Sequence, residues 1–225
     1  MAGPAQHSSP VLRRFPRRTA AKARTRARIL EAAGRLFAAP GYDSATMAAI
    51  AEAADVHVAT VFSHFRTKRH LFEAILACAG DWLEEAIESA RGRVRFLAFW
   101  TDLVRAAARA HARQEQASLA LAAAAQRHPD LLPAWLSYER RQIALFEGWI
   151  AAETGLDPAR DARPRTVAAM LVSAGILTHQ RWTAAPGAFD LEEEAERMIA
   201  AVCAILASGM PGLDPSIVRA DLPQR

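Results

Sequence analysis

The sequence predicts an all-α fold of about nine helices, and three observations support this prediction. Alanine dominates the composition, glycine and proline fall mostly at the edges of segments, and runs of alternating β-branched residues are absent. Apolar residues recur instead at helical spacing along most of the chain. At 225 residues, the chain is long enough to bury one sizeable core or two small ones.

The N-terminal part is expected to form three helices behind a disordered segment, residues 1–19. Pro40-Gly41 ends the first helix, and Ser44 or Asp43 is available to cap the second. Phe65 closes the small core behind the third helix. These helices are expected at about 20–39, 46–53 and 57–63.

A long helix is expected next, from its N-cap Thr67 to about residue 89. At about 1.5 Å per residue it extends about 33 Å, which is enough to connect two parts of the molecule. Asp190 and Glu193 fit a capping box at the start of the last helix. The remaining helices are expected at about 93–113, 116–127, 130–154, 164–184 and 190–208, before a flexible tail at 210–225.

Residues 46–63 have the features of a helix-turn-helix. Ala51 is small enough to let two helices approach closely, and Val61 is an aliphatic residue that locks the second helix against the first. Asp55 stands in the turn, where it can adopt the left-handed conformation, although glycine would do so at less cost. Because a helix-turn-helix places its second helix in the DNA major groove, the segment predicts DNA binding.

Further residues at fixed offsets extend this pattern over residues 25–76: Leu36-Phe37, Gly41-Tyr42, Thr46, Ile50-Ala51, Val56, Thr60, Phe62, His64-Phe65 and Lys68. On these residues the chain resembles the TetR family of bacterial transcriptional repressors. The resemblance implies a helix-turn-helix domain at 20–66 and a helical domain at 67–209 that binds a ligand and dimerises. The sequence departs from the family where Asp55 replaces glycine, His57 serine, Ala59 glycine, Phe62 tyrosine and Ala45 threonine.

The exposed side of the third helix is the expected reading surface. Val58 and the methyl group of Thr60 could meet thymine methyl groups, but the helix has no Arg, Asn or Gln for bidentate base contacts. Recognition could then depend partly on water or DNA shape, and His64 could equally be a capping or packing residue. The expected DNA-binding residues are Arg28, Thr46, His57, Val58, Thr60, Phe62, Ser63, His64 and Lys68.

Lys68 lies in the first turn of the long helix, where the helix dipole disfavours a cation. An external anion would resolve this conflict, and a DNA phosphate is the natural candidate because Arg66 and Arg69 flank the site. The alternative is a solvated lysine that costs a few tenths of a kcal/mol, on the order of the smaller helix-dipole effects.

Positive charge is concentrated near the N-terminus. Residues 1–80 contain twelve Lys or Arg against five Asp or Glu, whereas the remainder contains sixteen against nineteen. This asymmetry is typical of a nucleic-acid module joined to a separate domain. The basic arm could follow phosphates or enter the minor groove, or it could be a solvated tail; its cations are Arg13, Arg14, Arg17, Arg18, Lys22, Arg24, Arg26 and Arg28.

Aromatic residues collect between the long helix and residue 150, as expected for an apolar small-molecule site, although core packing explains each of them equally well. Asp102 and His111 are possible polar contacts. Few charges fall on these faces, which favours an apolar or aromatic effector; no cofactor or metal is expected. The expected ligand-binding residues are Trp82, Phe96, Trp100, Leu103, Trp135 and Phe146.

The helices at 164–184 and 190–208 have more apolar residues than a monomer is expected to expose. A homodimer would bury them in a four-helix interface and present two reading helices to a palindromic operator in double-stranded DNA. The alternative is burial in the chain's own core. The expected interface residues are Leu171, Gly175, Val202 and Ile205.

Other classes of protein fit the sequence less well. No segment reaches the ~20 apolar residues of a membrane span, and the N-terminus lacks the apolar region of a secretory signal. Cys78 and Cys203 read as two buried thiols in a reducing cytoplasm. No catalytic motif or metal-ligand spacing is present, which argues against an enzyme. The leading hypothesis is a cytoplasmic homodimeric repressor released by an effector; the alternatives are a non-specific nucleic-acid-binding module and, last, an enzyme.

Overall fold

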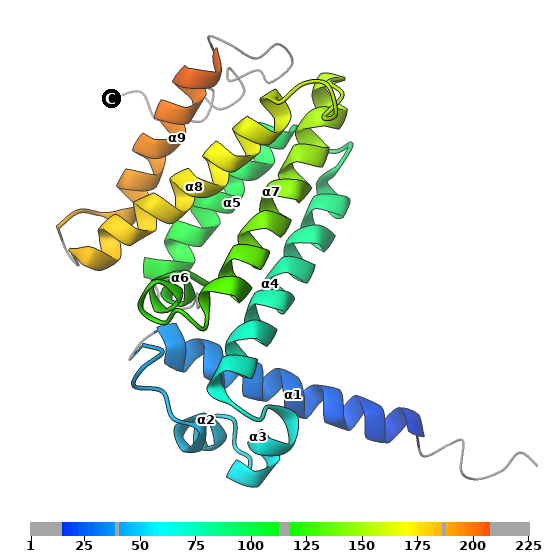
Figure 1. The fold of residues 1–225 in the computed structure, drawn as a ribbon, viewed down its shortest axis with the longest axis vertical. Helices are drawn as coiled ribbons and strands as arrows, with labels where there is room; N and C mark the ends of the chain where they lie inside the picture. Colours follow the sequence, from blue (N-terminus) through cyan, green and yellow to red (C-terminus); the bar gives the residue numbers. More distant parts are fainter. Residues whose placement is uncertain (1–14, 39–40, 113–117, 186–187, 208–225) are drawn as a thin grey trace, which may run out of the picture.

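The computed structural model describes residues 15–38, 41–112, 118–185 and 188–207, and in these ranges it contains helices and no strands (Figure 1). The prediction of an all-α fold is therefore confirmed. No described helix has the length and apolarity needed to cross a lipid bilayer. The helices are α1 (Phe15–Ala38), α2 (Met47–Ala53), α3 (Val58–His64), α4 (Lys68–Ala90), α5 (Phe96–Ala112), α6 (Ser118–Arg127), α7 (Leu132–Thr154), α8 (Arg163–Ala184) and α9 (Leu191–Ala207).

Helix α1 begins at Phe15, earlier than the sequence predicted, so residues 15–19 are helical and not disordered. Pro16 stands in the first turn, where a missing N–H breaks no hydrogen bond, and the Arg and Ala residues that follow favour a helix. The remaining helices begin and end within three residues of the predicted bounds. The predicted arm at 1–14 and the predicted tail at 210–225 lie outside the described residues.

Side-chain caps fix three of the helix starts. Thr46 Oγ1 accepts a hydrogen bond from Ala49 N at 3.1 Å and caps α2, which corrects the prediction that Ser44 or Asp43 does so. Thr67 caps α4 as predicted, accepting from His70 N at 3.3 Å. At α9, Asp190 Oδ1 accepts from Glu193 N at 2.9 Å, which is half of the predicted capping box.

Two buried clusters organise the molecule. In Figure 1, α2 and α3 lie at the lower end, α1 crosses beneath the upright helices, and α8 and α9 form the upper flank. We call helices α1, α2 and α3 with the first turn of α4 the reading head. The first cluster joins the reading head to α6 and the start of α7, through residues such as Ile29, Phe37, Ile50, Val61, Phe72, Leu121 and Trp135. The second joins α4, α5, α7, α8 and α9, through residues such as Leu83, Trp100, Phe146, Ile150, Leu171 and Val202.

Helix α4 contributes to both clusters. Leu71, Phe72 and Leu76 near its start lie in the first, and Leu83 and Ile87 near its end lie in the second. Any displacement of α4 along or across its axis is therefore felt by both parts of the molecule, because packed cores deform little.

The outer face of α4 carries Cys78, which is exposed. The prediction of two buried thiols holds for Cys203 but is wrong for Cys78. The reason is helical phase: Leu76, Gly80 and Leu83 turn toward the interior, and position 78 falls between them on the opposite side.

Candidate nucleic-acid interface and ligand cavity

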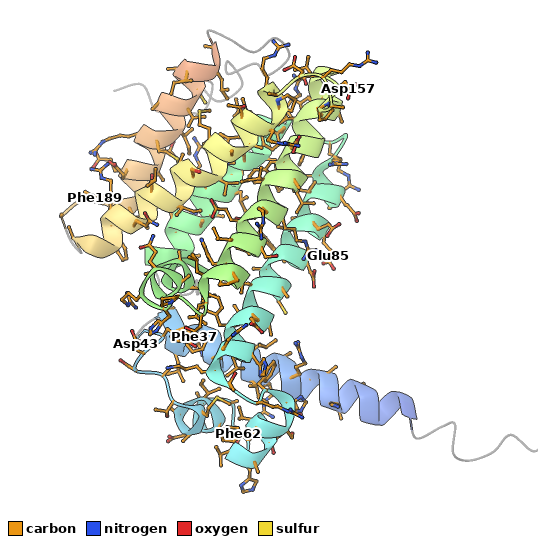
Figure 2. All side chains as sticks on the ribbon, in the orientation of Figure 1. Phe37, Asp43, Phe62, Glu85, Asp157 and Phe189 are labelled. Carbon is orange, nitrogen blue, oxygen red and sulfur yellow. The ribbon has the colours of Figure 1, made fainter. Side chains whose placement is uncertain are left out.

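Helix α3 has an outer face that is unusually apolar. Val58 is 44% exposed and Phe62 is 48% exposed, and the spacing of four residues places both on one side of the helix. Val61 of α3 and the C-cap residue Phe65 are buried in the first core. Figure 2 shows Phe62 at the lower end of the molecule, away from the upright helices. This face is available to a partner surface.

The turn before α3 is fastened to α1 by Arg28. Its Nη2 atom donates to Ala54 O at 2.5 Å and to both Asp55 O and Asp55 Oδ2 at 3.0 Å. Asp55 has a φ angle of 49°, which is the left-handed conformation expected from the sequence. The carbonyl groups at the end of a helix lack intrahelical partners, and Arg28 supplies donors to them. The described contacts of Arg28 are thus structural.

The small polar residues of the reading head have different surroundings. Thr46 is exposed but uses its hydroxyl as the α2 cap, and Ser63 Oγ donates to Thr60 O at 2.7 Å within α3. His57 is exposed at the N-cap of α3 and makes no side-chain capping bond. Thr60 is half-buried. His57 therefore has the freest polar side chain at the start of the reading helix.

Cations from α1 lie beside the end of α3. The Arg26 guanidinium carbon lies 5.0 Å from the centroid of the Phe65 ring. Burial, followed by the charges of Lys22 and Arg26, lowers the pKa of His64 below its ordinary value of 6.5. His64 is thus neutral at neutral pH, and its half-buried ring is partly committed to packing. The positive charge beside α3 comes from Lys22, Arg26 and the exposed Arg66.

Lys68 is held by the protein itself. Its Nζ atom donates to Tyr42 O at 2.6 Å and to Asp43 O at 3.3 Å, and lies 4.3 Å from the centroid of the Tyr42 ring. The expected conflict with the dipole of α4 is therefore relieved by two backbone carbonyls, which corrects the inference that an external anion is needed. Sequence alone could not show this, because the loop is 25 residues or more away along the chain.

Helices α4, α5, α7, α8 and α9 surround a cavity of about 200 Å³. Five of the six expected ligand-binding residues line it: Trp82, Trp100, Leu103, Trp135 and Phe146. The sixth, Phe96, does not, because its ring is buried in the second core against Phe146 and Trp149. Trp82 is 58% exposed, so the cavity reaches the surface beside it.

The expected polar contacts of the cavity also need correction. Asp102 points to solvent, forms an ion pair with Arg105, and is absent from the lining. The side chain of His111 lies outside the described part of the structure. The polar lining consists of Tyr138, Gln142 and Thr178, and Gln142 Nε2 donates to Tyr138 Oη at 3.2 Å. The spacing of four residues on one helix was the signal that could have identified the first two.

The expected dimer residues divide into two groups. Leu171 and Val202 are buried in the second core of their own chain, so the prediction that they form a subunit interface is corrected. Gly175 lines the cavity. Ile205 is 59% exposed on α9, as is Leu177 on α8. Helices α8 and α9 therefore expose fewer apolar residues to a partner than the sequence predicted.

Three comparisons with known proteins bear on what these surfaces do. The sequence profile described as "Bacterial regulatory proteins, tetR family" matches residues 29–75, which contain the C-terminal part of α1, all of α2 and α3, and the start of α4. The HTH-type transcriptional regulator TcmR of Streptomyces glaucescens is 30% identical over 176 residues, which are 71% of this chain and 73% of TcmR. The chain belongs to the TetR family.

Solved structures of regulators share the fold of this TetR-family protein. GusR of Salmonella enterica has a TM-score of 0.65 and 20% identity, and the match covers 92% of this chain and 99% of GusR. NalD, the secondary repressor of the MexAB-OprM multidrug efflux pump in Pseudomonas aeruginosa, has a TM-score of 0.56 and 25% identity over 80% of this chain and 96% of NalD. The protein is a DNA-binding transcriptional regulator and not an enzyme.

One junction in this TetR-family regulator was missed by sequence reasoning. His128 Nε2 lies 2.5 Å from Asp43 Oδ1, and Arg127 Nη2 lies 3.4 Å from Asp43 Oδ2, so the loop before α2 is tied to the end of α6 (Figure 2 labels Asp43). Burial raises the pKa of Asp43, but the hydrogen bond and charge of His128, with Arg127 and Lys68, lower it to a net value below 3.8.

No group of three His, Cys, Asp or Glu side chains that could hold a metal ion occurs within the described ranges. The candidate functional features of the described residues are the outer face of α3 and the cavity. Helix α4 connects them: Leu83 in its second half lines the cavity, and Lys68 in its first turn anchors the loop before α2.

Proposed function

We propose that this TetR-family regulator is a homodimeric repressor that binds a palindromic operator and is released by a small apolar or aromatic effector. The observation that carries the DNA-binding part is the outer face of α3. Two large apolar side chains, Val58 and Phe62, are about half exposed there, and Arg26 of α1 lies over the ring of Phe65 at the end of α3. Apolar groups of this kind suit thymine methyl groups and sugar edges in the major groove, while cations suit phosphates.

The likeness to NalD supports repression over activation, because NalD is itself a repressor and is 25% identical to this chain. The exposed Leu177 and Ile205 on neighbouring helices α8 and α9 support a second copy of the chain as partner. A two-fold axis there would present two α3 helices to successive major grooves about 34–36 Å apart. The expected site of action is the cytoplasm, where the operator is accessible.

Release requires that the effector favour a conformation that fits the operator poorly. The cavity supports this mechanism because α4 lines it with Ala79, Trp82 and Leu83 and continues into the reading head. A ligand that displaces this part of α4 would move the head relative to α8 and α9, and so change the separation of the two α3 helices. The coupling is carried by packing, since α4 belongs to both cores.

The test is a mobility shift with DNA from upstream of the protein's own gene, in the presence of excess competitor DNA. The wild-type protein should bind as two chains per site, with a strong dependence on salt. Phe62→Ala should weaken binding about tenfold or more, since one base contact contributes about 1–3 kcal/mol. Leu136→Ala is the matched control, because Leu136 is 42% exposed but lies on α7, outside the helix-turn-helix.

Two results would count against this proposal. Equal binding to competitor DNA would favour a non-specific nucleic-acid-binding module. Loss of binding with Leu136→Ala as large as that with Phe62→Ala, at unchanged helical content, would show that the outer face of α3 is not the reading surface.

A further inference from the structure

The cavity is selective in its electrostatics. Its lining comes from α4, α5, α7, α8 and α9, and among the described residues that line it none is Asp, Glu, Lys, Arg or His. A charged ligand group would lose its hydration there and find no counter-ion, at a cost of several kcal/mol, about the penalty for a buried unpaired ion. The occupant of this cavity is therefore expected to be uncharged.

The apolar walls favour flat rings. Trp82 of α4, Trp100 of α5 and Trp135 and Phe146 of α7 place four aromatic side chains around the cavity. Aromatic rings pack in offset or edge-to-face arrangements that suit another ring between them. An engineered cavity of about 150 Å³ holds benzene, so a cavity of about 200 Å³ accepts one to two fused rings.

One side of the cavity is polar. Gln142 Nε2 donates to Tyr138 Oη at 3.2 Å, which leaves the phenolic proton of Tyr138 to be donated elsewhere. Burial raises the pKa of Tyr138 to about 12, so this proton is retained at neutral pH. The Gln142 carbonyl oxygen accepts hydrogen bonds, and no hydrogen bond to it occurs in the described part of the chain. The pair thus offers one donor and one acceptor, side by side on α7.

We propose that the effector is an uncharged aromatic molecule of one to two fused rings with a hydroxyl or carbonyl group at one edge, bound by the Tyr138–Gln142 pair. This inference rests on the proposed function, since it assigns a ligand class to the same cavity. The aromatic walls bind the rings, the lack of charged side chains among the described lining residues disfavours acids and phosphates, and the polar pair fixes the orientation of the ligand.

Equilibrium dialysis with three probes tests the ligand class. At neutral pH, 1-naphthol should bind about tenfold more tightly than naphthalene, because it satisfies a hydrogen-bonding group that naphthalene leaves unpaired. The carboxylate 1-naphthoate should bind about a hundredfold more weakly than 1-naphthol, or not at all. Binding of 1-naphthoate as tight as that of 1-naphthol, or no binding of any probe, would overturn the inference.

Variants test the residues. Tyr138→Phe should abolish the preference for 1-naphthol over naphthalene while leaving naphthalene binding unchanged. Tyr42→Phe, which alters the only other tyrosine and lies in the first core, should keep the preference. A preference that survives Tyr138→Phe would refute the role of the pair. If Tyr138→Phe fails to fold, the three-probe comparison on the wild-type protein still decides the ligand class.

A second pair of variants tests the location. A Cβ atom built on Gly175 would meet no other atom within 4 Å, and Gly175 lines the cavity, so Gly175→Leu should fill it and block 1-naphthol. Gly148→Leu is the matched control, because Gly148 is an exposed helix glycine whose Cβ would lie 3.8 Å from Arg91 Nη2, outside the cavity. Operator binding is measured on the same samples without probe. If operator binding is absent, the proposed function is refuted. If the operator is bound normally but Gly175→Leu still binds 1-naphthol, only this inference is refuted.

Discussion

The turn residue Asp55 allows a conformational effect to be separated from an electrostatic one. Its φ angle is 49°, in the left-handed region, and its carboxylate pairs with Arg28 at 3.0 Å. Steric strain in this region costs a residue with a Cβ atom about 1–2 kcal/mol of stability. Glycine avoids this strain but loses about 0.5–1 kcal/mol through its larger loss of chain entropy on folding. The Asp55–Arg28 ion pair is largely solvent-exposed, so it contributes about 0.2–1 kcal/mol.

Both Asp55→Gly and Asp55→Ala remove the ion pair, and only the first removes the Cβ atom. We therefore expect Asp55→Gly to be more stable than Asp55→Ala by about 1 kcal/mol. For a chain of this size that difference corresponds to about 2–4 °C in Tm. Asp55→Asn, which keeps the tolerance of the left-handed region but loses the charge, should lie between wild type and Asp55→Ala.

Thermal unfolding at one protein concentration is the measurement, because self-association makes Tm depend on concentration. The backbone bonds from Arg28 to Ala54 O and Asp55 O remain in all three variants, so they cancel in the comparison. If Asp55→Gly and Asp55→Ala unfold at the same temperature, the left-handed turn carries no cost for a Cβ atom and the reasoning is refuted.

Two more predictions concern the contacts around the loop before α2. Lys68→Met keeps the apolar stem but removes the hydrogen bonds to Tyr42 O and Asp43 O. Thermal unfolding should therefore show that the free energy of unfolding falls by about 1.5–3 kcal/mol. Unchanged stability together with a lower salt dependence of DNA binding would instead place Lys68 on a phosphate. The pKa of Asp43 is below 3.8 in the folded protein, so its contribution to stability is present above that value and is lost as pH falls through the folded pKa. Urea unfolding between about pH 5 and pH 3 should therefore show a loss of stability that Asp43→Asn reduces, and an identical pH dependence in the two proteins would contradict it.

Much of the fold could be predicted because it depends on local periodicity. The spacing of apolar residues gave helix positions to within three residues for α2 to α9, and the Asp55 turn followed from the limits on left-handed backbone. The largest error was at α1, whose start before residue 20 depends on weak propensities alone.

The candidate sites were predicted less completely. Val58 was expected on the exposed side of the third helix and Phe62 was singled out by the family resemblance, and both side chains are exposed. Phe96, Leu171 and Val202 were misassigned, because an apolar residue on a helix can face a cavity, a partner or the chain's own core, and periodicity does not distinguish these.

The amino-acid sequence alone determined the all-α class, the reading helix and the left-handed turn, since each is a property of residues close together in the chain. The tertiary structure decided which side of each helix lies inside, that Lys68 is satisfied by carbonyls of the preceding loop, and that Tyr138 and Gln142 border a largely apolar cavity. Those features arise where helices distant in sequence meet, and the packing of whole elements, not local spacing, sets them.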